Sequence, residues 1–184
     1  MKRLTQLFEA ALFSAGHPLP VGELAKLDRE ATRAEVQEAL EELRSEYERK
    51  QRGIELVQVA EGYQILTRRE FADEIARARL VIRPRRLSAA ALETLAIVAY
   101  RQPVGRAEIE EIRGVSVEGV LRSLQERGLI DIVGRAEAMG RPLLYGTSAG
   151  FLELLGINDL SELPRLEELS VALRMPSALS GGGE

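Results

Sequence analysis

Apolar residues recur at helical spacing at the start of the chain, which predicts a helix over about residues 4–15. Phe8 and Leu12 lie on one face of this helix, and Gly16 ends it. Phe13 lies well away from that face and gives the helix a second apolar position. The second position suits packing against another copy of the chain or packing within its own unit, and both readings stay open. Phe8, Leu12 and Phe13 are therefore the candidate residues of a dimer interface.

The pattern then changes from helices to strands. A short helix over 21–27 precedes a longer one that begins after Thr32, where a Thr-x-x-Glu capping box starts. Alternating residues predict two strands at 54–59 and 63–66, joined by a turn at Glu61-Gly62. Three helices followed by a hairpin is the order of a winged helix-turn-helix.

The same order returns about 85 residues later. Ser88 and Ser116 are the expected N-caps of its first and third helices. The expected elements are helices over 88–101, 105–112 and 117–127, and strands over 130–133 and 142–145. The stretch PLPVGELAKL resembles QPVGRAEIEEI, which supports an internal repeat.

The chain is therefore predicted to be mainly α with small β wings, as two tandem winged helix-turn-helix domains. The expected domains are residues 1–83, which end in a helical connector, and residues 84–169. Residues 170–184 are rich in Pro, Ser and Gly, and are expected to be a disordered tail.

The helix predicted over 88–101 is apolar around most of its circumference, which indicates burial on more than one side. We expect Leu92 and Leu95 in the core. Ile97 and Tyr100 suit the core and a partner interface about equally.

Composition excludes several classes of function. The chain has no cysteine and one histidine, His17 in a Pro-rich turn, so it offers no thiolate metal site and no His-based triad. Phosphate-binding and dinucleotide-binding glycine motifs are also missing. We therefore expect no enzyme, no cofactor and no metal. Because no apolar run approaches the ~18–20 residues that span a bilayer, we expect no membrane contact and a cytoplasmic protein.

Charge argues against a DNA reader, although the fold often binds DNA. The net charge is −4, and the third helix of the first unit is acidic off its apolar stripe. Its acidic residues are Glu35, Glu38, Glu41, Glu42, Glu46 and Glu48. A DNA-binding winged helix would place this face against phosphates, which carry the same charge. Arg135, Arg141 and the basic end of the connector allow at most weak, non-specific, salt-sensitive contact with DNA.

Several segments resemble the bacterial segregation and condensation protein B family. They are LFEAALFSAGHPLPVGELAKL, LETLAIVAYRQPV, RAEIEEIRGV, GVLRSLQERGLI, GRAEAMGRPLLYGT, FLELLGI and NDLSELP, and they extend over roughly residues 4–169. The resemblance implies a homodimer formed through the N-terminal domains. It also implies binding of the kleisin, segregation and condensation protein A, and through it of the structural-maintenance-of-chromosomes (SMC) ATPase. The implied role is chromosome condensation and segregation at cell division, near the nucleoid and without chemistry of its own.

Exposure and composition suggest where a protein partner would bind. The candidates lie at the first helix-turn and on the wing of the second unit: Tyr100, Arg101, Gln102, Arg106, Arg135 and Arg141. The alternative function is a winged-helix transcription regulator, which would bind one DNA duplex tightly and sequence-specifically.

Overall fold

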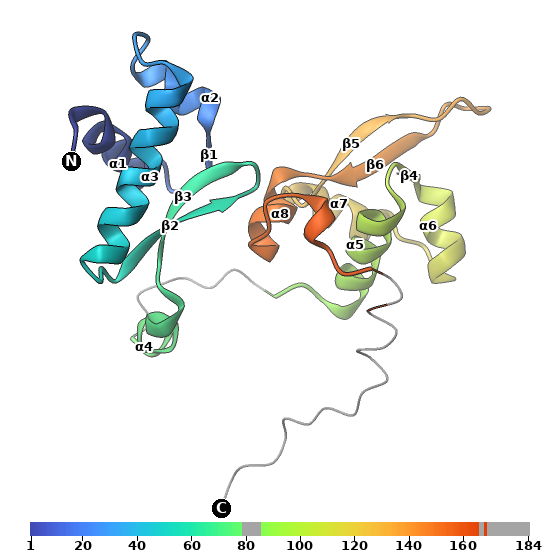
Figure 1. The fold of residues 1–184 in the computed structure, drawn as a ribbon. Helices are drawn as coiled ribbons and strands as arrows, with labels where there is room; N and C mark the ends of the chain where they lie inside the picture. Colours follow the sequence, from blue (N-terminus) through green and yellow to red (C-terminus); the bar gives the residue numbers. More distant parts are fainter. Residues whose placement is uncertain (79–85, 166–167, 169–184) are drawn as a thin grey trace, which may run out of the picture.

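The computed structural model describes residues 1–78, 86–165 and 168 of the chain. This part is mostly helical with two three-stranded antiparallel sheets, each in a separate unit (Figure 1). Each unit has its own cluster of buried apolar side chains. The tail expected over 170–184 lies outside the described residues.

The first unit runs from α1 to β3. Its elements are α1 (Arg3–Ala15), β1 (Leu19–Pro20), α2 (Val21–Leu24), the 3-10 turn η1 (Ala25–Leu27), α3 (Arg33–Arg49), β2 (Ile54–Val59) and β3 (Gly62–Thr67). The capping box of α3 is confirmed, because Glu35 N donates to Thr32 Oγ1 and Thr32 N donates to Glu35 Oε2. The hairpin turn differs from the prediction: Gly62 pairs with Val59, which leaves Ala60 and Glu61 as the turn.

The core of the first unit forms where α1 packs on α3. Phe8 is fully buried and Leu12 is 2% exposed, both within this cluster. Leu40 and Leu43 of α3 belong to the same cluster. The burial corrects the expectation that Phe8 and Leu12 face a second copy, since their own unit already covers them. Phe13 is 79% exposed and is the one of the three that another chain can reach.

The connector and the second unit follow. Their elements are η2 (Arg69–Phe71), α4 (Ala72–Arg77), α5 (Ala89–Arg101), β4 (Val104–Gly105), α6 (Arg106–Arg113), α7 (Glu118–Glu126), β5 (Ile130–Arg135), β6 (Leu143–Thr147), α8 (Ala149–Leu155) and η3 (Leu160–Glu162). The sheet orders are β1-β3-β2 in the first unit and β4-β6-β5 in the second, so the two sheets have the same topology.

Helix α5 buries a different face from the one that was predicted. Leu95 is buried as expected, but Leu92 is 53% exposed, so the expectation for Leu92 was wrong. Thr94 is fully buried instead. Its hydroxyl donates to the carbonyl of Ala90 and accepts a hydrogen bond from Arg113 at 2.7 Å. Burial of this polar side chain costs little free energy, because both its donor and its acceptor function have a partner.

Ile97 and Tyr100, which the sequence left between core and interface, are half-buried and pack against the second core.

Candidate protein-binding surfaces

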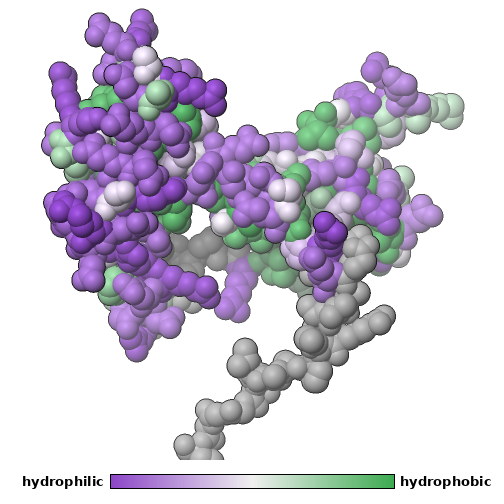
Figure 2. Space-filling model, in the orientation of Figure 1, coloured by the Kyte–Doolittle hydropathy of each residue, from purple (hydrophilic) through white to green (hydrophobic). Residues whose placement is uncertain are grey.

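The outward face of α3 carries four acidic residues of the first unit. Glu35, Glu38, Glu41 and Glu48 are exposed, and the surface of this unit is largely hydrophilic (Figure 2). Lys2 Nζ lies 2.6 Å from Glu38 Oε1 and Arg44 Nη1 lies 3.6 Å from Glu41 Oε2, so two of these charges are offset. The helix therefore presents a net negative charge, whereas a helix that binds DNA presents cations to the phosphates.

Glu42 of α3 is turned toward α1 and caps it. Helix α1 has no side-chain cap of its own at Lys2. Glu42 accepts a hydrogen bond from Lys2 N at 3.3 Å and another from the hydroxyl of Thr5, which is fully buried. The bond from Thr5 is the main reason that the pKa of Glu42 lies below its usual value. This carboxylate stabilises the packing of two helices and is not free for a ligand.

The end of α3 is also occupied by contacts within the unit. The hydroxyl of Tyr47 donates to Glu9 of α1 at 2.8 Å. Burial, followed by this hydrogen bond, raises the pKa of Tyr47. Glu46 accepts hydrogen bonds from Arg49 and Lys50, which lower its pKa to about 2. These groups are therefore engaged in contacts within the first unit, with Tyr47 buried at the edge of its core.

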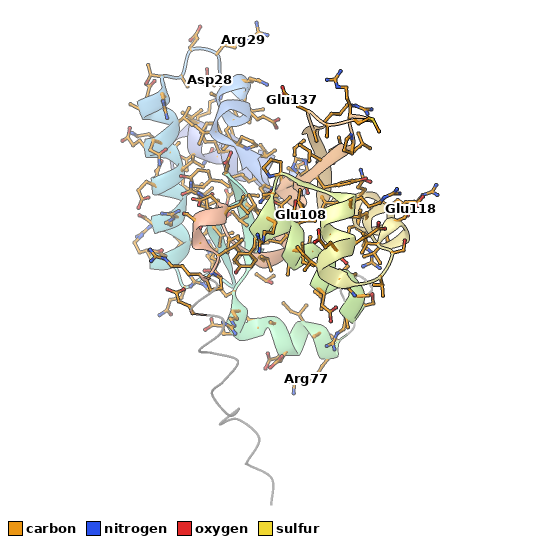
Figure 3. All side chains as sticks on the ribbon, turned by 90° about the vertical axis from the view of Figure 1, so that its right-hand side faces the viewer. Asp28, Arg29, Arg77, Glu108, Glu118 and Glu137 are labelled. Atoms are coloured by element: carbon orange, nitrogen blue, oxygen red, sulfur yellow. The ribbon has the colours of Figure 1, made fainter. Side chains whose placement is uncertain are left out.

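Charges on the equivalent helix of the second unit are paired. Arg122 lies 3.3 Å from Glu126 along α7. Arg106, at the start of α6, lies 3.1 Å from Glu118 at the start of α7, where Glu118 is labelled in Figure 3. Arginines that hold carboxylates are less available to read bases.

The predicted contact residues at the α5–α6 turn fall into two groups. The hydroxyl of Tyr100 donates to the carbonyl of Pro164 at 2.7 Å, and Gln102 Oε1 accepts from Thr147 N at 2.7 Å. These two side chains are therefore engaged by their own chain. Arg101 and Arg106 are exposed on the surface.

The β5–β6 hairpin brings the remaining two candidates together. Arg135 and Arg141 are both exposed, and Arg135 Nη1 donates to the carbonyl of Arg141 at 3.3 Å. The same hairpin exposes Ile132, Val133 and Met139, and Figure 2 shows a hydrophobic patch along it. This patch was not predicted from the sequence. The signal for it was the apolar pair in IDIVG on a strand that the topology places at the sheet edge.

The described part of the chain lacks two further features. Within residues 1–78, 86–165 and 168, no group of three or more His, Cys, Asp or Glu side chains is placed to hold a metal ion. In the same residues, no helix combines the length and the apolar character that crossing a membrane requires.

Two solved structures resemble the chain. ScpB from Mycobacterium tuberculosis is 37% identical and aligns over 84% of this chain and 96% of its own, with a TM-score of 0.40. A structure described as a dimer of the ScpB N-terminal domain complexed with ScpA peptide is 29% identical. It aligns over 40% of this chain and 91% of its own, with a TM-score of 0.38.

Sequence comparison covers almost the whole chain. The family described as "Segregation and condensation complex subunit ScpB" matches residues 6–166. Segregation and condensation protein B of Moorella thermoacetica is 47% identical over 182 residues, which are 98% of this chain and 91% of that protein. The protein of the same name in Syntrophotalea carbinolica is 50% identical over 167 residues, which are 91% of this chain and 84% of that protein. The chain therefore belongs to the segregation and condensation protein B family.

Proposed function

We propose that this protein is a non-enzymatic, dimeric adaptor that binds the kleisin, segregation and condensation protein A. Through the kleisin it would join the SMC ATPase and act in chromosome condensation and segregation during cell division. The observation that carries the proposal is the match to the ScpB family over residues 6–166, with relatives of that name 47% and 50% identical. A cytoplasmic location beside the nucleoid follows from that role.

Each unit is proposed to be a winged helix-turn-helix. The helix, strand, two helices and hairpin occur in the same order in both units, and each hairpin takes one short strand as its third. The separate cores support a boundary between the units near residue 84. We propose residues 1–83 for dimerisation and 84–169 for partner binding.

The dimer contact is proposed to include Phe13. An aromatic side chain that is 79% exposed adds apolar surface that a second copy could cover. The relative described as an N-terminal-domain dimer complexed with ScpA peptide has the kind of assembly that we propose here.

The kleisin contact is proposed to use the exposed arginines of the second unit. Arg101 and Arg106 lie at the α5–α6 turn, and Arg135 and Arg141 lie on the hairpin beside exposed apolar side chains. An acidic and apolar segment of the partner would fit such a surface.

Charge reversal at Arg106 tests this surface. Arg106→Glu is expected to weaken binding of the kleisin at least about tenfold, because it places like charge against an acidic segment. Binding is measured by calorimetric titration of the purified kleisin into the full chain, with light scattering to give the mass of the complex.

The matched control for Arg106 is Arg77→Glu. Arg77 is also exposed and also paired with a glutamate, 3.2 Å from Glu74, but it lies on α4 in the connector, outside the second unit. Equal affinity in both variants would show that Arg106 is not part of the contact.

The transcription-regulator alternative predicts tight, sequence-specific binding to DNA. The adaptor proposal instead predicts DNA binding that is weak and falls steeply with added salt, because the exposed face of α3 is acidic. Titration of the protein with random and genomic duplexes at physiological salt distinguishes the two. Nanomolar, sequence-dependent binding would replace the adaptor proposal with the regulator.

A further inference from the structure

The turn between β2 and β3 of the first unit has an unusual backbone. Its two residues, Ala60 and Glu61, have φ of +49° and +58°. Both values lie in the left-handed region, which costs energy for a residue with a Cβ atom. Hairpin turns with positive φ at both positions normally contain Asn-Gly. Neither Ala60 nor Glu61 is an Asn or a Gly. Backbone strain of this kind is concentrated at functional sites of proteins.

The main-chain amides of this turn are bonded to the second unit. The N–H of Ala60 donates to the carbonyl of Ile157, with 3.0 Å between N and O. The N–H of Glu61 donates to Asn158 twice, to the carbonyl at 3.2 Å and to Oδ1 at 3.0 Å. The ladder of the hairpin itself pairs the residues that flank the turn. The amides of Ala60 and Glu61 therefore find their partners across the two units.

The acceptor segment is held in place by its own hydrogen bonds. Glu162 Oε1 accepts from Asn158 N at 2.7 Å, and Asp159 Oδ1 accepts from Ser161 N at 2.7 Å. Together Asp159 and Glu162 form the capping box of η3. These bonds fix the direction of the Ile157 and Asn158 carbonyls, so little further ordering is needed when the turn docks.

Packing around this contact is incomplete. An open hollow of about 480 Å³ lies beside it and is lined by residues of both units, including Glu61, Leu152 and Leu160. The buried residues of the two cores form two clusters and do not merge. A contact that consists of a few hydrogen bonds beside an open hollow needs little free energy to break. The two units can therefore separate at this contact.

We propose that residues 60–61 and 157–162 form a latch that docks the two units reversibly. When the latch is closed, the units have the relative orientation of Figure 1. When it is open, the units are free to reorient while each core stays folded. A partner that prefers one orientation would shift the balance between the two states.

The groups in the latch determine how it responds to conditions. The bonds that cross between the units join amide N–H groups to neutral carbonyl oxygens, whereas the carboxylates of Asp159 and Glu162 bond within the second unit. Loss of one neutral hydrogen bond is expected to lower the ratio of closed to open molecules about fivefold.

Hydrogen exchange of the two turn amides measures closure directly. In the full chain, the amides of Ala60 and Glu61 are expected to exchange at least about tenfold more slowly than free amides. Asn158→Ala removes the Oδ1 acceptor and is expected to speed exchange at Glu61 about fivefold. Asn158→Asp keeps an oxygen acceptor but adds a negative charge, and it is expected to exchange more slowly at Glu61 than Asn158→Ala does. The amide of Leu129, which donates to Leu124 within the second unit, is the internal reference.

Two results of the exchange experiment would overturn the latch. One is free exchange at Ala60 and Glu61 in the parent chain. The other is an equal rate at Glu61 in the parent and in Asn158→Ala, while the reference amide stays protected in both.

A disulfide trap gives an independent test. The chain has no cysteine, so Glu61→Cys with Asn158→Cys creates a single possible pair. The control pairs Asn158→Cys with Glu137→Cys, in the β5–β6 loop, which lies far from the β2–β3 turn in Figure 1. Under mild oxidation, the latch pair is expected to form a bond within one chain at least about tenfold faster, because its thiols are held close together. Mass spectrometry distinguishes bonds within a chain from bonds between chains, and equal rates would overturn the proposal.

Discussion

Phe8→Ala is expected to destabilise the first unit by about 3–5 kcal/mol, the usual cost of removing a fully buried Phe side chain. The side chain of Phe8 extends from α1 and is fully buried in the core of the first unit. The loss is large beside the roughly 5–15 kcal/mol that holds a typical domain folded. Hydrogen exchange of the full chain, read separately for amides of the two units, should show the loss in the first unit and little change in the second.

Phe13→Ala is the matched control, since it makes the same change on the same helix. Phe13 is 79% exposed, so its replacement is expected to alter stability by less than about 0.5 kcal/mol. If Phe13 lies in the dimer contact, the variant should dissociate about 30-fold more readily, as is usual for loss of a central aromatic residue. Light scattering over a dilution series measures this. An unchanged dimer would remove Phe13 from the proposed interface.

Gly150→Ala is expected to destabilise the second unit by about 3 kcal/mol, through forced overpacking. Gly150 lies in the first turn of α8, and an added Cβ would collide with the carbonyl oxygen of Gly128. That oxygen belongs to the main chain and cannot swing away as the end of a side chain could. The change should lower the midpoint of urea unfolding followed by circular dichroism.

The control for this variant is Gly119→Ala. Gly119 is also near the start of a helix, α7, but a Cβ there would meet nothing within 4 Å. Alanine at that position is expected to stabilise the protein by about 0.5–1 kcal/mol, because it reduces the freedom of the unfolded chain. A loss of stability in Gly119→Ala equal to that in Gly150→Ala would mean that steric contact at Gly128 is not the cause.

Local signals in the sequence predicted most of the helices. The capping box at Thr32 and the cap at Ser88 both form as expected, because each needs only residues within one helical turn. Strands β1 and β4 were not predicted, since two residues carry no alternation to recognise.

Features that depend on contacts between elements could not be predicted from local patterns. Ser116 was expected to cap α7, but the side chain of Glu110 on α6 accepts from Val117 N at 3.1 Å instead. Leu92 was placed in the core, but α5 turns to bury Thr94 beside Arg113. In both cases, a charged side chain from another helix decides the outcome.

For the candidate contact residues, the sequence predicted the exposure of four arginines and not the bonds of the other two side chains. Local composition singled out Arg101, Arg106, Arg135 and Arg141, which are indeed exposed. It did not show that Tyr100 is engaged by Pro164, because that bond joins residues 64 positions apart. The hydrogen bonds of the β2–β3 turn to the second unit could not be predicted from the sequence either, since they use main-chain groups that every residue has.

The four outward carboxylates of α3 have a consequence for a protein that works beside a chromosome. Lys2 and Arg44 offset the charges of Glu38 and Glu41, but Glu35 and Glu48 keep the net charge of this face negative. Its repulsion extends one screening length, about 8 Å at physiological ionic strength, from the helix. In the proposed role, the adaptor is surrounded by a great excess of non-specific duplex. A surface that repels polyanions keeps the subunit from being sequestered there, so that its free concentration remains available to the kleisin.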